Sequence, residues 1–398
     1  MRKEIKKAPT IRFRGFTDDW KQRKLGDIVD FLDTQRKPLT ENIREKGPYP
    51  YYGASGIVDY VVGYIFDEEL VLLSEDGANI TDRNYPVCFL ASGKYWVNNH
   101  AHVLKTKEGI DNNFICNSLE GKDFSIYNTG MAMPKLNQDI CKRIPVDFPT
   151  YDEQEKIGNY FRDIDYFITL HQRKLDQLKK LKKYFLQNMF PAKGEKVPRI
   201  RFKGFTGDWE QRKLGDLGKA RSGIGFPNDE QGGKDGIPFY KVSDMNNAGN
   251  EHEMITANNY VTREQIARKG WSVIEEVPAI FFAKVGAAVL LNRKRLCRFP
   301  FLLDNNTMAY SIDRSVLNTD FAKTLFETID LTALIQVGAL PSYNAGDVEN
   351  VNVVIPRMAE QKKIGANFKK LDNLITLHQC KLDQLQTMKK FMLQNLFI

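Results

Sequence analysis

The sequence predicts a mixed α/β (α+β) protein with an internal pseudo-twofold repeat, in which two largely antiparallel β modules are separated by two long helices forming an antiparallel coiled coil. Three observations predict this fold. Two segments recur nearly unchanged within the chain, and one of them carries a sustained heptad pattern. The stretches between the repeats contain short β-rich runs bounded by turn signals.

The repeats set the organisation of the 398-residue chain. The segments that recur, each with its copy, are 9–28 with 198–217 and 151–190 with 358–397. The stretches between them, 29–150 and 218–357, resemble each other only faintly. A recent duplication with neutral drift is the alternative explanation, but neutral drift would not spare the frame alone. We therefore expect a shared frame that carries two unlike modules.

The longer repeat has the pattern of a coiled-coil helix. Apolar side chains recur at steps of four and three, at Ile157, Phe161, Ile164, Ile168, Leu175 and Leu178, and in the second copy at Ile364, Phe368, Leu371, Ile375, Leu382 and Leu385. About 38 helical residues would span roughly 57 Å. His171 and His378 fall at a positions, where polar side chains set register. A metal or catalytic role is the alternative for these histidines, but no partner ligand lies at i+3 or i+4.

These patterns predict four segments. They are residues 1–150 (first module), 151–190 (first long helix), 191–357 (linker and second module) and 358–398 (second long helix).

Composition indicates the kind of partner and the compartment. The formal net charge of +8 and pI near 9.0 favour a polyanionic partner such as nucleic acid, although many proteins of this size are mildly basic. Five scattered cysteines without Cys-x-x-Cys spacing argue against a disulfide framework or zinc site, and for the reduced cytoplasm. The sequence contains no secretory signal and no apolar run long enough for a membrane span.

Polar and basic residues cluster with glycines in the turns of both modules. Lysine and arginine can bind phosphates or guanine edges, and asparagine can pair with adenine, so these turns have the chemistry for reading bases. For any single residue an ordinary solvated turn is the alternative, and the prediction therefore rests on the clusters. The candidate DNA-binding residues are Lys37, Tyr52, Ser55, Asn79, Arg83, Asn99, His100, Lys135 and Asn137 in the first module, and Ser222, Lys241, Ser243, Lys284, Asn292, Arg293, Asn306, Ser342 and Asn344 in the second.

Several catalytic motifs are absent from the sequence. It contains no Walker A pattern, no Asn-Pro-Pro-aromatic motif of amino-methyltransferases and no convincing nuclease cluster. The single Gly-x-Gly, at 223–225, lacks the strand–helix context of a cofactor loop. We therefore expect no catalytic residue, metal or cofactor in this chain, and any chemistry to lie on partner chains.

The order of parts and several phrases resemble the specificity subunits of type I restriction–modification enzymes. The resemblance covers essentially the whole chain, and only the combination of phrases is specific. The residues that carry it are 16–20 and 205–209 (FTDDW, FTGDW), 24–27 and 213–216 (KLGD), 50–56 (PYYGASG), 238–245 (PFYKVSDM), Glu153-Gln154 with their copy, and the Leu-Asp-Gln-Leu heptads.

The resemblance implies a non-catalytic subunit with two target-recognition domains, each reading one half of a split, asymmetric site in double-stranded DNA. It implies that the helices set the unread gap, that two modification subunits bind the repeated frame and methylate adenine with S-adenosylmethionine, and that two restriction subunits add ATP- and Mg²⁺-dependent translocation and cleavage. A coiled-coil scaffold without DNA binding, and a stand-alone methyltransferase or nuclease, are the alternatives.

Overall fold

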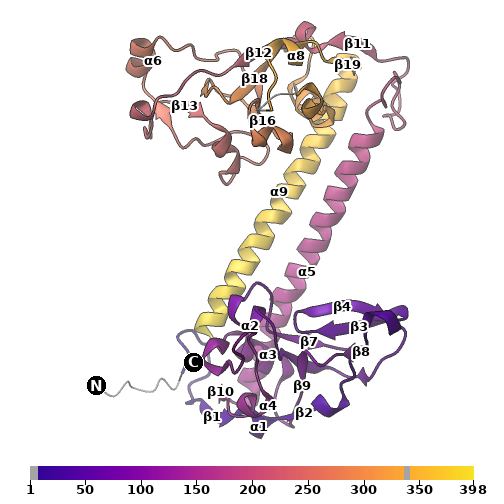
Figure 1. The fold of residues 1–398 in the computed structure, drawn as a ribbon, viewed down its shortest axis with the longest axis vertical. Helices are drawn as coiled ribbons and strands as arrows, with labels where there is room; N and C mark the ends of the chain where they lie inside the picture. The colour runs from indigo at the N-terminus through magenta and orange to yellow at the C-terminus, as the bar shows by residue number, and fades with distance from the viewer. Residues whose placement is uncertain (1–7, 336–340) are drawn as a thin grey trace. The chain divides into compact units, whose positions relative to one another are not determined.

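The computed structural model describes residues 8–335 and 341–398, and the chain divides into two compact units (Figure 1). The first unit comprises Met1–Gln172 and Cys380–Ile398, and the second comprises Arg173–Gln379. Each long helix thus contributes one part to each unit. Within the described residues, no helix is both long enough and apolar enough to cross a membrane.

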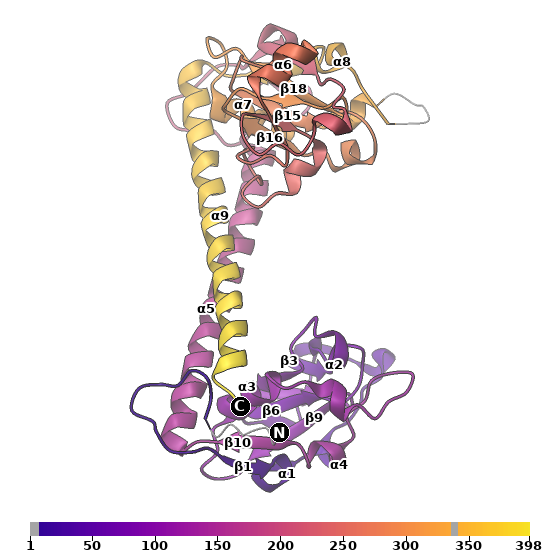
Figure 2. The same ribbon diagram turned by 90° about the vertical axis from the view of Figure 1, so that its left-hand side faces the viewer.

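The first unit combines two four-stranded sheets, a two-stranded ribbon and short helices. Its elements are β1 (Lys21–Lys24), α1 (Leu25–Ile28), β2 (Val29–Phe31), β3 (Lys46–Gly53), β4 (Gly56–Val61), β5 (Phe66–Asp67), β6 (Leu70–Ser74), α2 (Asn79–Asp82), β7 (Cys88–Ala91), β8 (Lys94–Val97), β9 (Ala101–Thr106), α3 (Asn112–Glu120), α4 (Gln138–Cys141) and β10 (Pro145–Phe148). One sheet, ordered β2-β9-β6-β7, is fully antiparallel. The other, ordered β4-β3-β8-β5, is antiparallel except for the β3–β8 pair. Helix α3 packs on β6 and β7 (Figure 2).

The second unit repeats this topology with different side chains. Its elements are β11 (Glu210–Lys213), β12 (Gly218–Ser222), β13 (Ile237–Tyr240), β14 (Tyr260–Val261), α6 (Arg263–Lys269), β15 (Ala279–Ala283), β16 (Lys294–Cys297), β17 (Leu302–Leu303), β18 (Thr307–Ile312), α7 (Thr319–Thr328), α8 (Ala345–Glu349) and β19 (Asn352–Ile355). The antiparallel sheet β12-β18-β15-β16 corresponds to β2-β9-β6-β7, and β14-β13-β17 again contains one parallel pair, β13–β17. The prediction of a mixed α+β fold is therefore confirmed.

The repeated sequence segments build the same frame in both units. The ribbon β1–β10 pairs Lys21 with Phe148, and the ribbon β11–β19 pairs Glu210 with Ile355, in the same register. Arg12 binds the buried Glu153 through two N–H···O bonds of 2.7 Å. Arg201 binds the buried Glu360 in the same way, at 2.7 and 2.8 Å. The near-identity of the repeated segments thus reflects equivalent contacts in the two units.

The two long helices, α5 (Tyr151–Asn188) and α9 (Met358–Asn395), have 38 residues each. In the first unit the beginning of α5 packs on the end of α9, where the rings of Phe161 and Phe397 stack at 5.8 Å. In the second unit the beginning of α9 packs on the end of α5, where the rings of Phe368 and Phe190 lie 6.1 Å apart. The helices therefore run antiparallel within each unit, and each core takes an aromatic ring from just beyond the other helix's C-terminus.

Cross-helix ion pairs occupy equivalent polar positions of the helices. Lys389 of α9 pairs with Asp165 of α5 at 2.6 Å in the first unit. Lys182 of α5 pairs with Asp372 of α9 at 2.7 Å in the second unit. A polar side chain at a seam position is satisfied only in the register that brings its partner opposite, so these pairs specify the alignment of the helices.

A glycine lets each long helix approach the start of a short helix closely. A Cβ atom on Gly365 of α9 would lie 2.6 Å from the backbone nitrogen of Phe321 in α7. On the equivalent Gly158 of α5 it would overlap the carboxylate of Asp111, the N-cap of α3. Because the contact at Gly365 is with backbone, it cannot be relieved by a side-chain rotation.

Replacing Gly365 by alanine is expected to lower the free energy of unfolding by about 1–3 kcal/mol, since an added methyl group must displace packed backbone. Urea unfolding followed by circular dichroism would measure it. Gly225→Ala is the matched control, because a methyl group added to that glycine would meet no atom within 4 Å and its backbone is not left-handed. Equal losses for both variants would contradict the close-approach argument.

Candidate nucleic-acid interface

In the first unit, several turns meet at one edge of the two sheets. The backbone N–H of Asn98 donates to Tyr52 O at 3.0 Å, which links the β8–β9 turn to the end of β3. The N–H of Glu75, just after β6, donates to His100 O at 2.9 Å, and the N–H of Leu136 donates to Glu75 O at 2.7 Å. These hydrogen bonds bring together side chains that are distant in sequence. The first loop cluster, as we name it, comprises the exposed Lys37, Ser55, Asn99, His100, Lys135 and Asn137.

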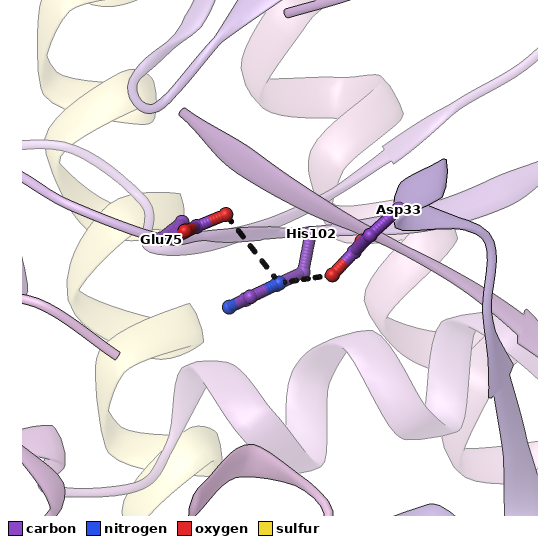
Figure 3. Close-up of side chains that lie close together, drawn as sticks. All are labelled: Asp33, Glu75 and His102. Carbon is purple, nitrogen blue, oxygen red and sulfur yellow. Dashed lines mark hydrogen bonds and ion pairs between the residues drawn. The ribbon is translucent and has the colours of Figure 1, made fainter. Parts of the chain in front are cut away.

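Beneath this cluster lies a buried network around His102 of β9 (Figure 3). Its Nδ1 lies 2.7 Å from an Asp33 carboxylate oxygen and 3.7 Å from Glu75, and its Nε2 lies 2.7 Å from the carbonyl oxygen of Leu136. Arg36 donates to Glu75 at 2.6 Å. Because Nδ1 faces a carboxylate and Nε2 faces a carbonyl oxygen, the arrangement favours an imidazolium that donates from both ring nitrogens.

The electrostatics of the network agree with this protonation. Burial by itself would lower the pKa of His102, but its interactions with Asp33, and also with Cys141, raise it to about 10. Burial by itself would raise the pKa of Asp33, but the hydrogen bond from His102 lowers it below its usual range. The two groups therefore form a charged pair across the neutral pH range.

Asp33, Glu75 and His102 also have the spacing of a cation site, because their ligand atoms lie within 4.8 Å of one another. Their donors and acceptors do not fit a metal ion, however. A ligating histidine must present a neutral nitrogen lone pair, whereas both His102 nitrogens already face oxygen acceptors at 2.7 Å. Arg36 and Lys135 already neutralise Glu75, at 2.6 and 3.3 Å. The group fits an internal charge network that ties the turns to the sheet.

The second unit gathers its own turns at the equivalent edge. The N–H of Lys284, just after β15, donates to Asn306 O at 2.9 Å, and Gly286 N–H donates to Pro341 O at 2.9 Å. Gly223 N–H donates to Thr307 O at 3.0 Å. The second loop cluster, as we name it, comprises Ser222, Lys241, Ser243, Lys284, Asn306 and Ser342. Residues 337–340 of the related passage before Ser342 lie outside the described residues.

Equivalent positions in the two clusters carry different chemistry. Lys284 follows its central strand where Glu75 follows the equivalent strand of the first unit. Asp304 N–H donates to Tyr240 O at 3.0 Å, in the place of the Asn98–Tyr52 hydrogen bond. One framework therefore presents two unlike sets of polar groups.

Two other candidate residues form hydrogen bonds within the protein. Arg83 and Asn292 both have left-handed backbones, with φ of 55° and 49°, at the ends of equivalent turns. Arg83 donates to the Glu120 carboxylate at 3.0 Å beside the end of α3, and Asn292 accepts from Leu331 N–H at 3.1 Å just after α7. Each side chain ties its turn to the neighbouring helix, so neither is part of our proposed DNA surface.

Asn79, Asn344 and Tyr52 also have structural partners. Asn79 accepts from Tyr85 N–H at 2.8 Å, and Asn344 caps α8 by accepting from Asp347 N–H at 3.0 Å. The ring of Tyr52 stacks on Phe89 at 5.8 Å, and burial raises the pKa of its hydroxyl. These three residues therefore stabilise the turns that carry the loop clusters.

Two remaining groups of candidates stay predictions. Arg293 donates to the Asn246 side chain at 2.7 Å, and Lys241 of the second loop cluster donates to Gln231 at 3.1 Å. Each side chain has further N–H donors, and its role in DNA binding stays a prediction. His171 and His378 are half-buried on α5 and α9, and their role in setting the register of the helices stays a prediction.

Sequence reasoning missed the His102 network and the Arg12–Glu153 and Arg201–Glu360 pairs. His102 stands in a short strand, and nothing local marks it as charged. The two ion pairs had a detectable signal, because both partners of each pair recur within the repeated segments.

Comparison with known proteins agrees with these observations. Residues 17–180 and 206–387 match the family model described as Type I restriction modification DNA specificity domain. A protein of Haemophilus influenzae named as a putative type I restriction enzyme specificity subunit is 25% identical over 368 residues, covering 90% of this chain and 89% of that protein. A type I restriction enzyme specificity subunit of Methanocaldococcus jannaschii is 20% identical over 411 residues, covering 94% and 91%.

A solved structure shows the same fold. The S subunit of a type I restriction–modification system from M. genitalium superposes with a TM-score of 0.72 at 14% identity, covering 98% of this chain and 99% of that one. Since two copies of the family model account for most of the sequence, this chain belongs to the family of DNA specificity subunits of type I restriction–modification systems.

Proposed function

We propose that each loop cluster reads one half of a split, asymmetric site in double-stranded DNA. The observation that carries this proposal is the pairing of one repeated framework with two chemically unlike loop clusters. Two recognition domains built on the same framework would bind DNA in the same orientation, and their unlike side chains would recognise different bases.

The polar groups of the clusters suit both tasks of DNA binding, which are phosphate contact and base recognition. Lys37 and Lys135 in the first cluster, and Lys284 in the second, can bind phosphates and position the protein. Asn99 and Asn306 offer the amide that pairs with adenine, and serine hydroxyls can donate or accept. The formal charge of +8 favours the same partner.

The long helices would act as the spacer between the two readers. Their antiparallel packing in each unit and their matched ion pairs support an antiparallel coiled coil with a pseudo-twofold relation between the halves. Such a spacer would fix the number of unread base pairs between the half-sites.

The repeated frame would dock two modification subunits. The helices leave apolar side chains exposed at equivalent places: Leu170 with Leu377, Leu181 with Met388, and Tyr184 with Phe391. A surface presented twice by one chain fits two copies of one partner. This chain would be non-catalytic and hold no cofactor, with S-adenosylmethionine on the modification subunits, and ATP and Mg²⁺ on two restriction subunits.

Exchanging residues 29–150 for the equivalent module of another family member is expected to change only one half of the recognised sequence. The repeated segments 9–28 and 151–190 lie outside the exchange, so partner docking is expected to be preserved. Mapping methylated adenines genome-wide, in cells that carry the chimera and the modification subunit, gives the result directly.

The matched control is the exchange of residues 218–357, which is expected to change only the other half. A change of both halves by either exchange would contradict the proposal of independent readers. Methyl transfer by the purified chain alone would contradict the assignment of chemistry to partner subunits.

A further inference from the structure

The loop that follows residue 128 in the first unit presents two methionines to solvent from a rigid base. Met131 is fully exposed and Met133 is 61% exposed. The side chain of Asn128 accepts from the N–H groups of Gly130, at 2.9 Å, and Lys135, at 2.8 Å, which closes the loop at both ends. A Cβ on Gly130 would overlap the Met133 carbonyl oxygen, so the tight turn requires glycine.

The C-terminal side of this loop is bound continuously to the turn after β6. Gly77 N–H donates to Pro134 O at 3.0 Å, Leu136 N–H donates to Glu75 O at 2.7 Å, and the His102 ring donates to Leu136 O at 2.7 Å. The buried imidazolium network thus holds the base of the loop in place. The two methionines are the large apolar side chains that residues 129–137 expose to solvent.

We infer that Met131 and Met133 enter a DNA groove and make apolar contacts with base edges in the half-site read by the first loop cluster. This inference rests on the proposed function. It follows from three features. The loop ends at Lys135 of the cluster, its base is hydrogen-bonded to the His102 network, and its side chains are flexible and apolar. Thymine methyl groups and other apolar base edges are the groups that such side chains contact in DNA. A tip ordered before binding loses little backbone entropy on contact.

The contact predicts a DNA affinity that depends on apolar character and not on charge. Met131→Gln/Met133→Gln keeps the side-chain length but makes it polar, and it is expected to weaken binding roughly tenfold to hundredfold. Met131→Leu/Met133→Leu is expected to restore most of the affinity. Neither pair should change the slope of log affinity against log salt, because no phosphate contact is lost, whereas Lys135→Ala should reduce it.

The experiment uses the full chain assembled with its modification subunits. Fluorescence anisotropy is measured on a labelled duplex that contains the site found by methylated-adenine mapping, and on a scrambled duplex. Phe299→Ala is the matched control. Phe299 is similarly exposed, but it belongs to neither loop cluster. Its neighbour Arg298 pairs with Asp320 near the start of α7. Its affinity is expected to equal that of the wild type.

The outcomes separate the two proposals. If the wild-type complex does not prefer the mapped site, the proposed function is overturned. If the wild type binds and the glutamine variant binds equally well, only the methionine contact is overturned. If the glutamine variant loses assembly with the modification subunits but the assembled fraction binds DNA normally, the loop is a protein contact and the inference fails. Weaker binding by the glutamine variant with rescue by leucine supports it.

Discussion

Replacing Glu360 by alanine is expected to destabilise the second unit by about 3 kcal/mol, because it leaves the guanidinium of Arg201 without its counter-ion. Glu360 is 2% exposed and accepts both N–H groups of Arg201, whose side chain is 14% exposed. Arg201 also donates to the Gly207 carbonyl at 2.6 Å, which links the ion pair to the turn just before β11. The loss should therefore spread to the ribbon β11–β19.

The matched control is Glu276→Ala. Its carboxylate lies 2.6 Å from Arg221, as short as the buried pair, but the two side chains are 58% and 43% exposed. Solvent screens such a pair, so the expected loss is much smaller than that of Glu360→Ala. Urea unfolding measures the two changes, and amide hydrogen exchange in β11 and β19 locates the first. Similar losses in both variants would show that burial does not govern the strength of the Glu360 pair.

The frame could be predicted from the sequence because its signals are periodic and repeated. The heptads predicted a helix over 151–190, and α5 spans Tyr151–Asn188. Aromatic and charged residues that recur at one offset, such as Phe161 with Phe368 and Asp165 with Asp372, perform the same contacts twice. Residues that are retained in both copies of the repeat make the same structural contacts twice. The repeat therefore identifies structural residues without an alignment of relatives.

The loop residues could not be sorted in this way, because local sequence does not reveal where a polar side chain finds its partner. Arg83 and Lys135 are both basic residues of glycine-containing turns, and both pair with a glutamate. Arg83 binds Glu120 beside α3, whereas Lys135, which pairs with Glu75, remains 46% exposed in the first loop cluster. Asn292 and Asn99 differ likewise, since only Asn292 closes a left-handed turn. The partners of Arg83 and Asn292 lie more than twenty positions away, and only the folded chain brings them together.

His102 offers the second large effect, because its protonation is coupled to folding. Its pKa is about 10 in the folded protein, against about 6.5 for an unperturbed histidine. A raised folded pKa contributes stability that is fully present below pH 6.5 and is lost as the pH rises through about 10. For Asp33, whose folded pKa is lowered, the contribution is present above its ordinary pKa and is lost in acid. The pair should therefore stabilise the first unit most between the ordinary pKa of an aspartate, below which the Asp33 contribution begins to be lost, and pH 6.5.

Replacing His102 by glutamine is accordingly expected to cost most near pH 6 and progressively less towards pH 10, with each pKa unit worth about 1.4 kcal/mol. His100→Gln is the matched control: His100 also contacts a carboxylate, Asp76 at 2.9 Å, but its side chain is 50% exposed, so its replacement should cost less than about 1 kcal/mol. Urea unfolding across this pH range measures both variants. Because the chain has only five histidines, NMR can also follow each ring directly. One ring should stay protonated at pH 9 and vanish from the spectrum of His102→Gln. If every histidine ring is neutral at that pH, the buried imidazolium does not exist, and the loop clusters must be held by uncharged hydrogen bonds instead.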